Sequence, residues 1–352
     1  MTEQCPPLPE DDLAHILGHT RELWPGAKGK SFFITGGTGF VGIWLLESFA
    51  YANETLGLNA RAVVLSREPE AFQRRAPHLA HRAGLTFVKG DVRDLAVAEE
   101  VFDYVIHAAT AVADRDRPAQ SAGQMLAILE GTQHVAKFAA SAKARHLLYV
   151  SSGAVYGAQP ADLAKLPESY CGGPETTSIQ SGYGIGKRAA EHLLAMHAIT
   201  DRLQLKIARC FSFVGPHLDA DRFAIGNFIR DAMAGQPVRI RGDGTPQRSY
   251  LYAADLAIWL WTILFRGTDS RIYNVGSEVG ITIRDCAKVV VEAVNPSLAV
   301  EVGQPAITGA SAERYVPHTG RARIELQLQE QIPLSEAIRR TVAWLRTAPP
   351  TS

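Results

Sequence analysis

Short apolar runs alternate with longer amphipathic segments from Ser31 to about residue 210. The runs are rich in β-branched and aliphatic residues and show no alternation of apolar and polar positions, which is typical of strands buried on both faces of a sheet. This order predicts an α/β fold with a doubly wound, Rossmann-type parallel sheet. The expected strands are 32–35, 62–65, 85–88, 104–107, 147–151 and 205–208.

A glycine-rich loop follows the first expected strand directly. It has the sequence GGTGFVG over residues 36–42, and a helical pattern begins directly after it, at Ile43. Such a heptapeptide alone is most often a turn, but between a strand and a helix it predicts a phosphate-binding loop. Gly36 permits the tight turn, Gly39 lets the backbone approach a pyrophosphate, and Gly42 lets the helix pack closely on the strand. The expected cofactor-binding residues here are Gly36, Gly39, Phe40, Val41 and Gly42.

Residues after the next strands bear on which dinucleotide is bound. NAD usually requires a carboxylate after the second strand for its ribose 2′-hydroxyl, where this chain has Ser66 and Arg67. A guanidinium there suits a 2′-phosphate, so NADP is favoured, and NAD stays possible because Glu68 lies close by. Asp91 either accepts a hydrogen bond from the adenine amino group or is a helix N-cap or turn residue. The rest of the expected cofactor site follows the third and fourth strands: Val92 and Ala108.

Two further segments carry candidate proton-transfer groups: SSGAVYG at 151–157 and SGYGIGK at 181–187. Tyr183 and Lys187 are four residues apart and share one helix face. Hydride transfer between a secondary alcohol and a nicotinamide needs a group that takes or gives the hydroxyl proton, and a nearby ammonium lowers the pKa of a tyrosine toward that task. Lys187 is also expected to bind the nicotinamide ribose. Ser152, or its neighbour Ser151, can hydrogen-bond the reacting oxygen.

Together these segments resemble those of extended short-chain dehydrogenases/reductases, specifically the nucleotide-sugar epimerase/dehydratase family. Similar segments continue with IARCF at 207–211, GNFI at 226–229, GDGTPQRSY at 242–250 and YNVG at 273–276. The resemblance implies a Rossmann-type domain and a smaller C-terminal region that binds a sugar linked to a nucleoside diphosphate. It also implies that Arg248 clamps the diphosphate, that Asn227 contacts the nucleotide, and that Ser152 and Tyr183 contact the sugar. One alternative for Arg248 is an ordinary loop arginine.

We expect three parts in the chain: a helical extension over 1–28, a dinucleotide-binding domain with the catalytic residues over 29–215, and a mainly nucleotide-sugar-binding region over 216–352. In the extension, Asp12 to Trp24 has roughly helical spacing, with Asp11 or Asp12 as a possible N-cap. Helices are also expected over 120–140 and 183–198. In similar proteins the corresponding pair packs against its mate, so a homodimer is expected.

The two residues after the strand-end serine bear on the reaction. Family dehydratases resemble one another in carrying Asp-Glu there, where this chain has Gly153 and Ala154. Neither residue transfers a proton, which argues against a 4,6-elimination and weakens a decarboxylase. An epimerase that acts through a 4-keto intermediate needs only the catalytic trio and room for the sugar to rotate, and is favoured. The alternatives are an NADPH-dependent 4-keto-sugar reductase, a dehydratase or decarboxylase, and a sensor that binds the dinucleotide without turnover.

Composition argues against several other partners. Lys plus Arg number 36 and Asp plus Glu also 36, so no net positive field attracts nucleic acid or an anionic membrane. The four cysteines are scattered, without a metal-binding spacing or a disulfide framework, so we expect no metal and a reducing, cytoplasmic location. No apolar run has membrane-spanning length, and the first residues lack the pattern of a signal peptide.

Overall fold

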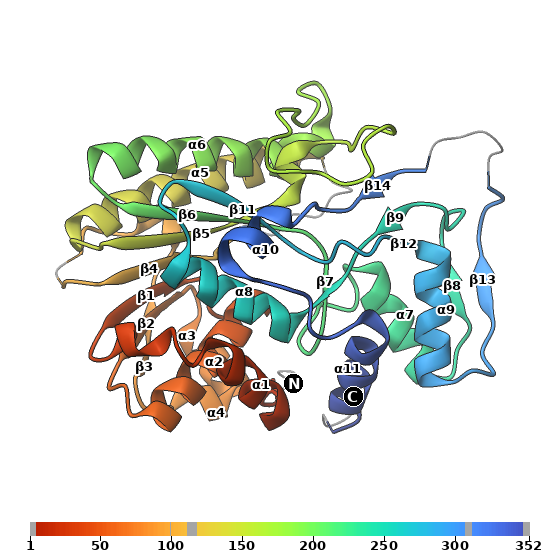
Figure 1. The fold of residues 1–352 in the computed structure, drawn as a ribbon, viewed down its shortest axis with the longest axis horizontal. Helices are drawn as coiled ribbons and strands as arrows, with labels where there is room; N and C mark the ends of the chain where they lie inside the picture. Colours follow the sequence, from red (N-terminus) through yellow and green to blue (C-terminus); the bar gives the residue numbers. More distant parts are fainter. Residues whose placement is uncertain (1–4, 99, 111–117, 307–311, 348–352) are drawn as a thin grey trace.

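A parallel seven-stranded sheet runs through the centre of the computed structural model, which describes residues 5–98, 100–110, 118–306 and 312–347 (Figure 1). The strand order is β11-β6-β5-β4-β1-β2-β3, and every neighbouring pair is parallel. All six strands expected from the sequence are present, which confirms the Rossmann-type class. The strands are β1 (Ser31–Thr35), β2 (Arg61–Ser66), β3 (Leu85–Lys89), β4 (Tyr104–His107), β5 (His146–Ser152), β6 (Gln204–Cys210) and β11 (Arg271–Val275).

Helices cover both faces of this sheet (Figure 1). One face packs against α5 (Pro118–Ser141) and α6 (Gly182–Thr200), and the other against α2 (Phe40–Leu56) and α8 (Ala253–Arg266). Successive strand residues enter opposite clusters: Phe33 faces α5, whereas Phe32 and Ile34 face α2 and α8. Because both faces are buried, the strands need apolar residues at every position, which explains their continuous apolar runs. Short helices complete this lobe: α3 (Pro69–Arg75), α4 (Pro77–Ala80), η2 (Val92–Asp94), η3 (Gly153–Tyr156) and η4 (Ile179–Ser181).

A smaller lobe extends beyond the carboxyl edge of the sheet. Its helices are α7 (Ala224–Met233), α9 (Ile283–Val294) and α11 (Leu334–Thr347), with α10 (Gly320–Leu326) between the lobes. Thr282 caps α9 by accepting the amide hydrogen of Asp285. The short strands are β7 (Phe213–Val214), β8 (Val238–Ile240), β9 (Gln247–Arg248), β10 (Leu251–Tyr252), β12 (Ile281–Thr282), β13 (Val300–Val302) and β14 (Arg314–Tyr315). They pair as β10-β7, β12-β9-β14 and β13-β8.

The chain passes between the two lobes more than once. After β6 it enters the smaller lobe at α7, then returns with α8 and β11, and leaves again with α9. β11 pairs with β6 at the edge of the central sheet. α8 is mostly apolar because the sheet covers one side of it and α1 covers another; its Trp259 and Trp261 are both buried. A cut at residue 215 would therefore remove a strand and a covering helix from the sheet that they complete.

The N-terminal extension forms α1 (Glu10–Thr20) and η1 (Trp24–Ala27). The expected start of this helix is wrong by two residues: Pro9 is the N-cap, and Asp11 and Asp12 lie inside the first turn. Proline is tolerated at a helix start because the first amide hydrogens have no partner within the helix. The apolar side of α1 is buried in the same core cluster as α2 and α8, so the extension is part of the main core.

Candidate active site

The glycine loop forms a tight connection between β1 and α2. Gly36 has a φ of 75°, and a Cβ there would lie 2.5 Å from the carbonyl carbon of Ala108. A Cβ at Gly42 would lie 2.2 Å from the oxygen of Gly36, so both positions require glycine. Gly39, the exposed N-cap of α2, has no neighbour closer than 3.6 Å to such a Cβ. The loop therefore leaves Gly39 open in front of the amide hydrogens at the start of α2, an arrangement that fits a pyrophosphate.

Charged residues gather where β2 and β3 end. Ser66 is the last residue of β2, and its hydroxyl accepts the amide hydrogen of Glu68 at 3.3 Å. Arg67 is exposed. Asp91 caps η2 and accepts three hydrogen bonds from Arg93, which lower the pKa of its carboxyl group. Arg67 also acts on this carboxylate, so two guanidinium groups lie near the point where the adenosine end of a dinucleotide is expected.

The three expected catalytic residues come from β5 and α6. Ser152 ends β5 and is 8% exposed, while Tyr183 and Lys187 lie one helical turn apart on α6. Lys187 is 1% exposed, and its Nζ donates a hydrogen bond to the carbonyl oxygen of Val150 at 2.8 Å. Burial lowers the pKa of Lys187 to about 8. The lysine is thus held against the end of β5, on the helix that carries Tyr183.

A buried ion pair lies behind Ser152. Arg209 on β6 donates hydrogen bonds to both carboxylate oxygens of Glu191, at 2.6–3.2 Å. Ser151 donates to the same carboxylate at 2.5 Å. The Ser151 hydroxyl is therefore already hydrogen-bonded to the ion pair. This favours Ser152 as the serine available to a substrate. The sequence analysis missed Glu191, although it follows Lys187 by four residues and so lies on the same helix face.

Tyr315 and Phe211 form a wall beside Ser152, and the sequence analysis missed both. Their ring centres are 4.6 Å apart. The Tyr315 hydroxyl lies over Gly153, and burial raises the pKa of this tyrosine. A Cβ at Gly153 would lie 2.6 Å from this hydroxyl and 2.7 Å from Phe211 Cζ. The site thus has no room for a side chain at position 153.

A search for known protein families finds a match over residues 32–276 to the NAD dependent epimerase/dehydratase family. The chain belongs to this family. Its relatives are enzymes of the extended short-chain dehydrogenase/reductase type, and so is this protein.

Known relatives of this epimerase/dehydratase family member catalyse different reactions. It is 27% identical over 325 residues to UDP-glucuronic acid decarboxylase 1 of Arabidopsis thaliana, a match that covers 91% of this chain and 71% of the relative. It is 24% identical to a dTDP-glucose 4,6-dehydratase of Streptomyces antibioticus, over 90% of this chain and 92% of the relative. A solved UDP-glucose 4-epimerase of Thermus thermophilus, in complex with NAD, has the same fold with a TM-score of 0.73 at 24% identity, over 91% and 100% of the two chains.

The two residues expected at the nucleotide sugar lie on the smaller lobe of this family member. Arg248 on β9 donates a hydrogen bond to Glu313 at 2.9 Å and is the strand partner of Tyr315 on β14, which places it near the expected catalytic residue Ser152. Asn227 on α7 donates to the carbonyl oxygen of Phe223 at 3.2 Å and accepts from Arg230 at 2.7 Å. In this structure Asn227 therefore stabilises the start of its own helix.

His107 at the end of β4 has a structural role. It is 2% exposed, hydrogen-bonded to Thr35 and Thr132, and burial lowers its pKa to about 3. The ring is therefore neutral at physiological pH. Within the described part of the chain, no three His, Cys, Asp or Glu side chains are grouped to hold a metal ion, and no helix is long and apolar enough to cross a membrane.

Proposed function

We propose that this enzyme is an epimerase that acts on a sugar linked to a nucleoside diphosphate, through a 4-keto intermediate. The observation that carries the proposal is the combination at the end of β5. Ser152 lies there beside α6 with Tyr183 and Lys187, and the adjoining position 153 lacks both a carboxylate and the space for one. An elimination needs an extra acid and base, whereas epimerisation needs only the trio.

Each member of the trio has a role that follows from its position. Tyr183 takes the proton from the sugar 4-hydroxyl, and Ser152 hydrogen-bonds the same oxygen. The ammonium of Lys187 favours negative charge on the phenolic oxygen one turn away. A bound nicotinamide supplies the hydride acceptor. Gly39 and the first amide hydrogens of α2, from Phe40, Val41 and Gly42, would hold its pyrophosphate.

We infer that the cofactor is NADP, with NAD as the alternative that the solved NAD-bound relative keeps open. Arg93 is hydrogen-bonded to Asp91, and the charge of Arg67 also lowers the pKa of this carboxyl group. Either guanidinium can therefore bind a 2′-phosphate in place of the Asp91 carboxylate. Arg67→Glu should weaken NADP binding and shift the preference toward NAD. Titration of both cofactors into both proteins measures this. Arg145→Glu is the control, because Arg145 directly precedes β5 and so lies at the amino ends of the strands, away from the carboxyl ends where the cofactor is expected. An unchanged preference in Arg67→Glu would contradict the assignment of Arg67.

A reductase of NDP-4-keto sugars is the second candidate, and the pair of arginines favours it because NADPH is a common reductant. Incubation of the enzyme with nucleotide hexoses and their 4-keto forms, followed by mass spectrometry, separates the candidates. An isomer of unchanged mass without added reductant supports epimerisation, and a gain of two hydrogens with NADPH supports reduction. Loss of water or of carbon dioxide would overturn the argument from Gly153 and Ala154.

The cofactor that copurifies gives a second, independent measurement. An epimerase returns its hydride in each cycle and can retain the oxidised dinucleotide, whereas a reductase must exchange it. Denaturation of the purified protein should therefore release an oxidised dinucleotide.

We also propose a homodimer. We place the protein in the cytoplasm because its four cysteines are free, as suits a reducing compartment.

A further inference from the structure

The buried pair of Glu191 and Arg209 joins two elements beside the catalytic trio. Glu191 lies on α6, one helical turn after Lys187, and Arg209 lies on β6. β6 is the neighbour of β5 in the central sheet, and their register places Arg209 opposite Ser151, the residue before Ser152. Glu191 is 5% exposed and Arg209 is 9% exposed, so little water competes for their hydrogen bonds. The pair therefore connects α6 to the sheet next to Ser152.

Two hydrogen bonds join the end of β5 to α6. The hydroxyl of Ser151 donates to Oε1 of Glu191 at 2.5 Å. Arg209 donates to both oxygens of this carboxylate from two of its nitrogens, so the acceptor that Ser151 meets is held in one position. One turn earlier on α6, Lys187 donates to the carbonyl oxygen of Val150 at 2.8 Å. Two consecutive residues of β5 are therefore bonded to two residues of α6.

The segment after Ser152 contacts the other side of Arg209. The guanidinium carbon of Arg209 lies 4.6 Å from the centre of the Tyr156 ring in η3, a distance typical of a cation–π contact. The Tyr156 hydroxyl donates to Oδ1 of Asn274 at 2.7 Å, and Asn274 is fully buried in β11. Ser152 therefore lies between two residues, Ser151 and Tyr156, that contact the same ion pair.

A buried ion pair adds little net stability but requires a specific arrangement. The removal of both charges from water costs about as much free energy as their attraction gains, so apolar residues of similar size often stabilise a fold equally well. We propose that Glu191 and Arg209 are positioning residues, which together fix Ser152 relative to the proton-transfer residues of α6. This role rests on the proposed function, in which Ser152 and Tyr183 reach the same sugar oxygen and a displacement of about 1 Å lowers the rate by up to about 10²-fold.

Replacement of the ion pair by apolar residues separates positioning from stability. Glu191→Met/Arg209→Met removes both charges and keeps side chains of similar length, so its melting temperature should stay near that of wild type. Its kcat should fall by about tenfold or more, with KM changed by less than about threefold. A wild-type kcat in the folded variant would overturn the proposal. Lys206→Met is the matched control, because it removes a buried cation of the same strand that is bonded to Asp269, and it should leave kcat unchanged.

Variants of Ser151 test the link to β5 and do not depend on the folding of the double variant. Ser151→Ala should lower kcat by about tenfold in the wild-type background, and by less than about twofold in Glu191→Met/Arg209→Met, where the acceptor is already absent. Equal losses in both backgrounds would show that Ser151 acts on the substrate directly, and would overturn the proposal. Ser151→Thr keeps the hydroxyl and should stay within about twofold of the wild-type kcat. A loss as large as that of Ser151→Ala would contradict the role of this hydrogen bond.

Amide hydrogen exchange needs no substrate and therefore separates this role from the proposed function. If the bond from Ser151 to Glu191 holds α6 against β5, Ser151→Ala should speed exchange over residues 187–194 by about fivefold, whereas exchange in β2 should keep its wild-type rate. Unchanged exchange over residues 187–194 would overturn the proposal. Faster exchange, together with inactivity of the wild-type protein on every nucleotide sugar, would overturn the proposed function and leave the connection between β5 and α6 in place.

Discussion

At the scale of single residues, Tyr183 has the most direct test. If its phenol transfers the substrate proton, Tyr183→Phe should lower turnover by about 10²–10⁴-fold while cofactor binding and thermal stability stay near wild type. Steady-state kinetics and a cofactor titration measure the two effects. Tyr51→Phe on α2, remote from the site, is the control and should retain full activity. Turnover of Tyr183→Phe within twofold of wild type would remove Tyr183 from the mechanism.

The burial of Lys187 predicts a specific dependence of stability on pH. Its pKa falls from 10.5 to about 8 on folding, so between these pH values the unfolded chain holds a proton that the folded chain has lost. The free energy of unfolding should therefore rise with pH across this interval, by about 3 kcal/mol from this group. Lys187→Met should remove that part of the rise.

Urea unfolding of both proteins near neutral pH and near pH 10.5 measures the difference. Lys137→Met is the control because Lys137 is an exposed lysine on α5, and it should retain the wild-type rise. The same pH dependence in wild type and Lys187→Met would contradict the burial of a depressed amine. The expected result also means that the charged form of Lys187 destabilises the fold, as is common for groups that a protein retains for function.

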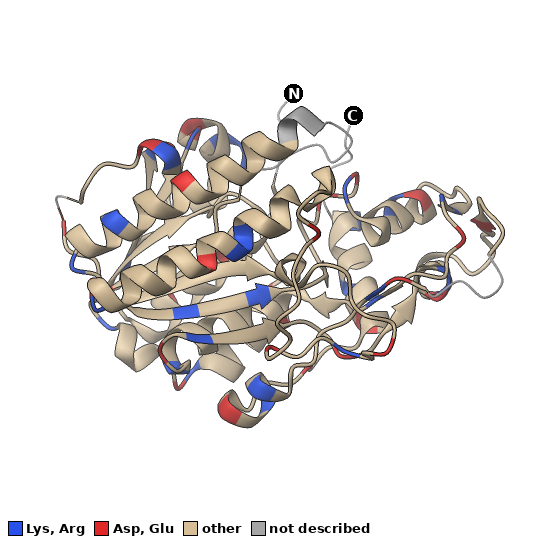
Figure 2. Cartoon of the chain, turned by 90° about the horizontal axis from the view of Figure 1, so that it is seen from above, with Lys and Arg blue, Asp and Glu red and all other residues tan. Residues whose placement is uncertain are grey.

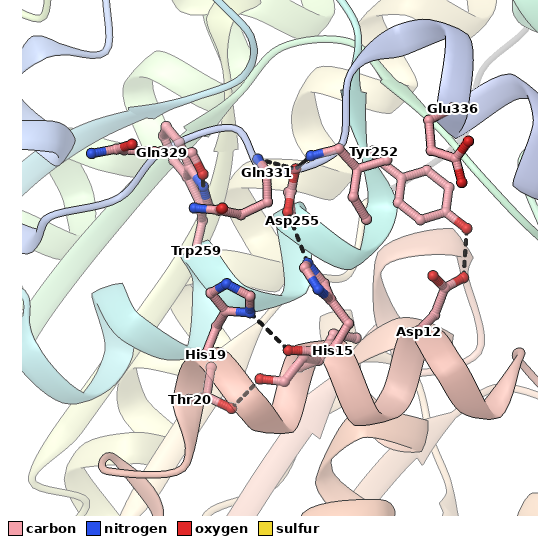
Figure 3. A network of polar contacts seen from close by, with 12 residues as sticks. Asp12, His15, His19, Thr20, Tyr252, Asp255, Trp259, Gln329, Gln331 and Glu336 are labelled. Carbon is pink, nitrogen blue, oxygen red and sulfur yellow. Dashed lines mark hydrogen bonds and ion pairs between the residues drawn. The ribbon is translucent and has the colours of Figure 1, made fainter.

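At the scale of elements, α1 is joined to both lobes by buried polar contacts (Figure 3). Asp12 accepts hydrogen bonds from Tyr252 at 2.5 Å and from Arg340 of α11 at 2.7 Å. One turn further, His15 faces Asp255 of α8 at 3.6 Å, and this carboxylate also accepts two amide hydrogens from the loop before α11. The extension therefore fixes α8 and α11 relative to each other.

Removal of the Asp12 charge should weaken this connection. Asp12→Asn leaves Arg340 without one of its carboxylates and should lower the free energy of unfolding by about 1–3 kcal/mol. Asp11→Asn, an exposed neighbour in the same helical turn, is the control and should change stability by less than about 0.5 kcal/mol. Chemical unfolding curves compare the variants, and equal stability of the two would show that the contacts of Asp12 contribute nothing net.

At the scale of the whole molecule, the layer formed by α5 and α6 is the expected dimer face. Figure 2 looks onto this layer, where charged residues are sparse. The only charged residues of α5 are Glu130 and Lys137. Large apolar side chains on the two helices are exposed, among them Leu126 at 51%, Met196 at 47% and Ile199 at 82%. A surface of this composition suits a symmetric contact with a second copy.

Light scattering at about 10 μM should report a mass about twice the 38.2 kDa of one chain. Ile199→Asp places a charge in the proposed contact and should shift the protein toward the monomer. Ile324→Asp, at an equally exposed isoleucine of α10 (78%), should leave the mass unchanged. A wild-type monomer with full activity would contradict the proposed dimer.

The sequence by itself determined the features that depend on local spacing. The continuous apolar runs predicted the strands, and the closely spaced glycines predicted the turn before α2. The separation of four residues placed Tyr183 and Lys187 on one face of α6. Helix and strand periods fix each of these within a few residues, so no knowledge of distant contacts is needed.

Only the tertiary structure decided which distant segments meet. It returned β11 to the central sheet, joined Glu191 to Arg209, and brought the Tyr315 hydroxyl over Gly153. A two-residue strand such as β14 is too short to show a repeating pattern in the sequence. Its position follows from its pairing with β9 and its packing on Phe211. The positions of the proposed proton-transfer residues on β5 and α6 were therefore predictable, whereas the wall formed by Tyr315 and Phe211 depended on packing between segments far apart in the chain.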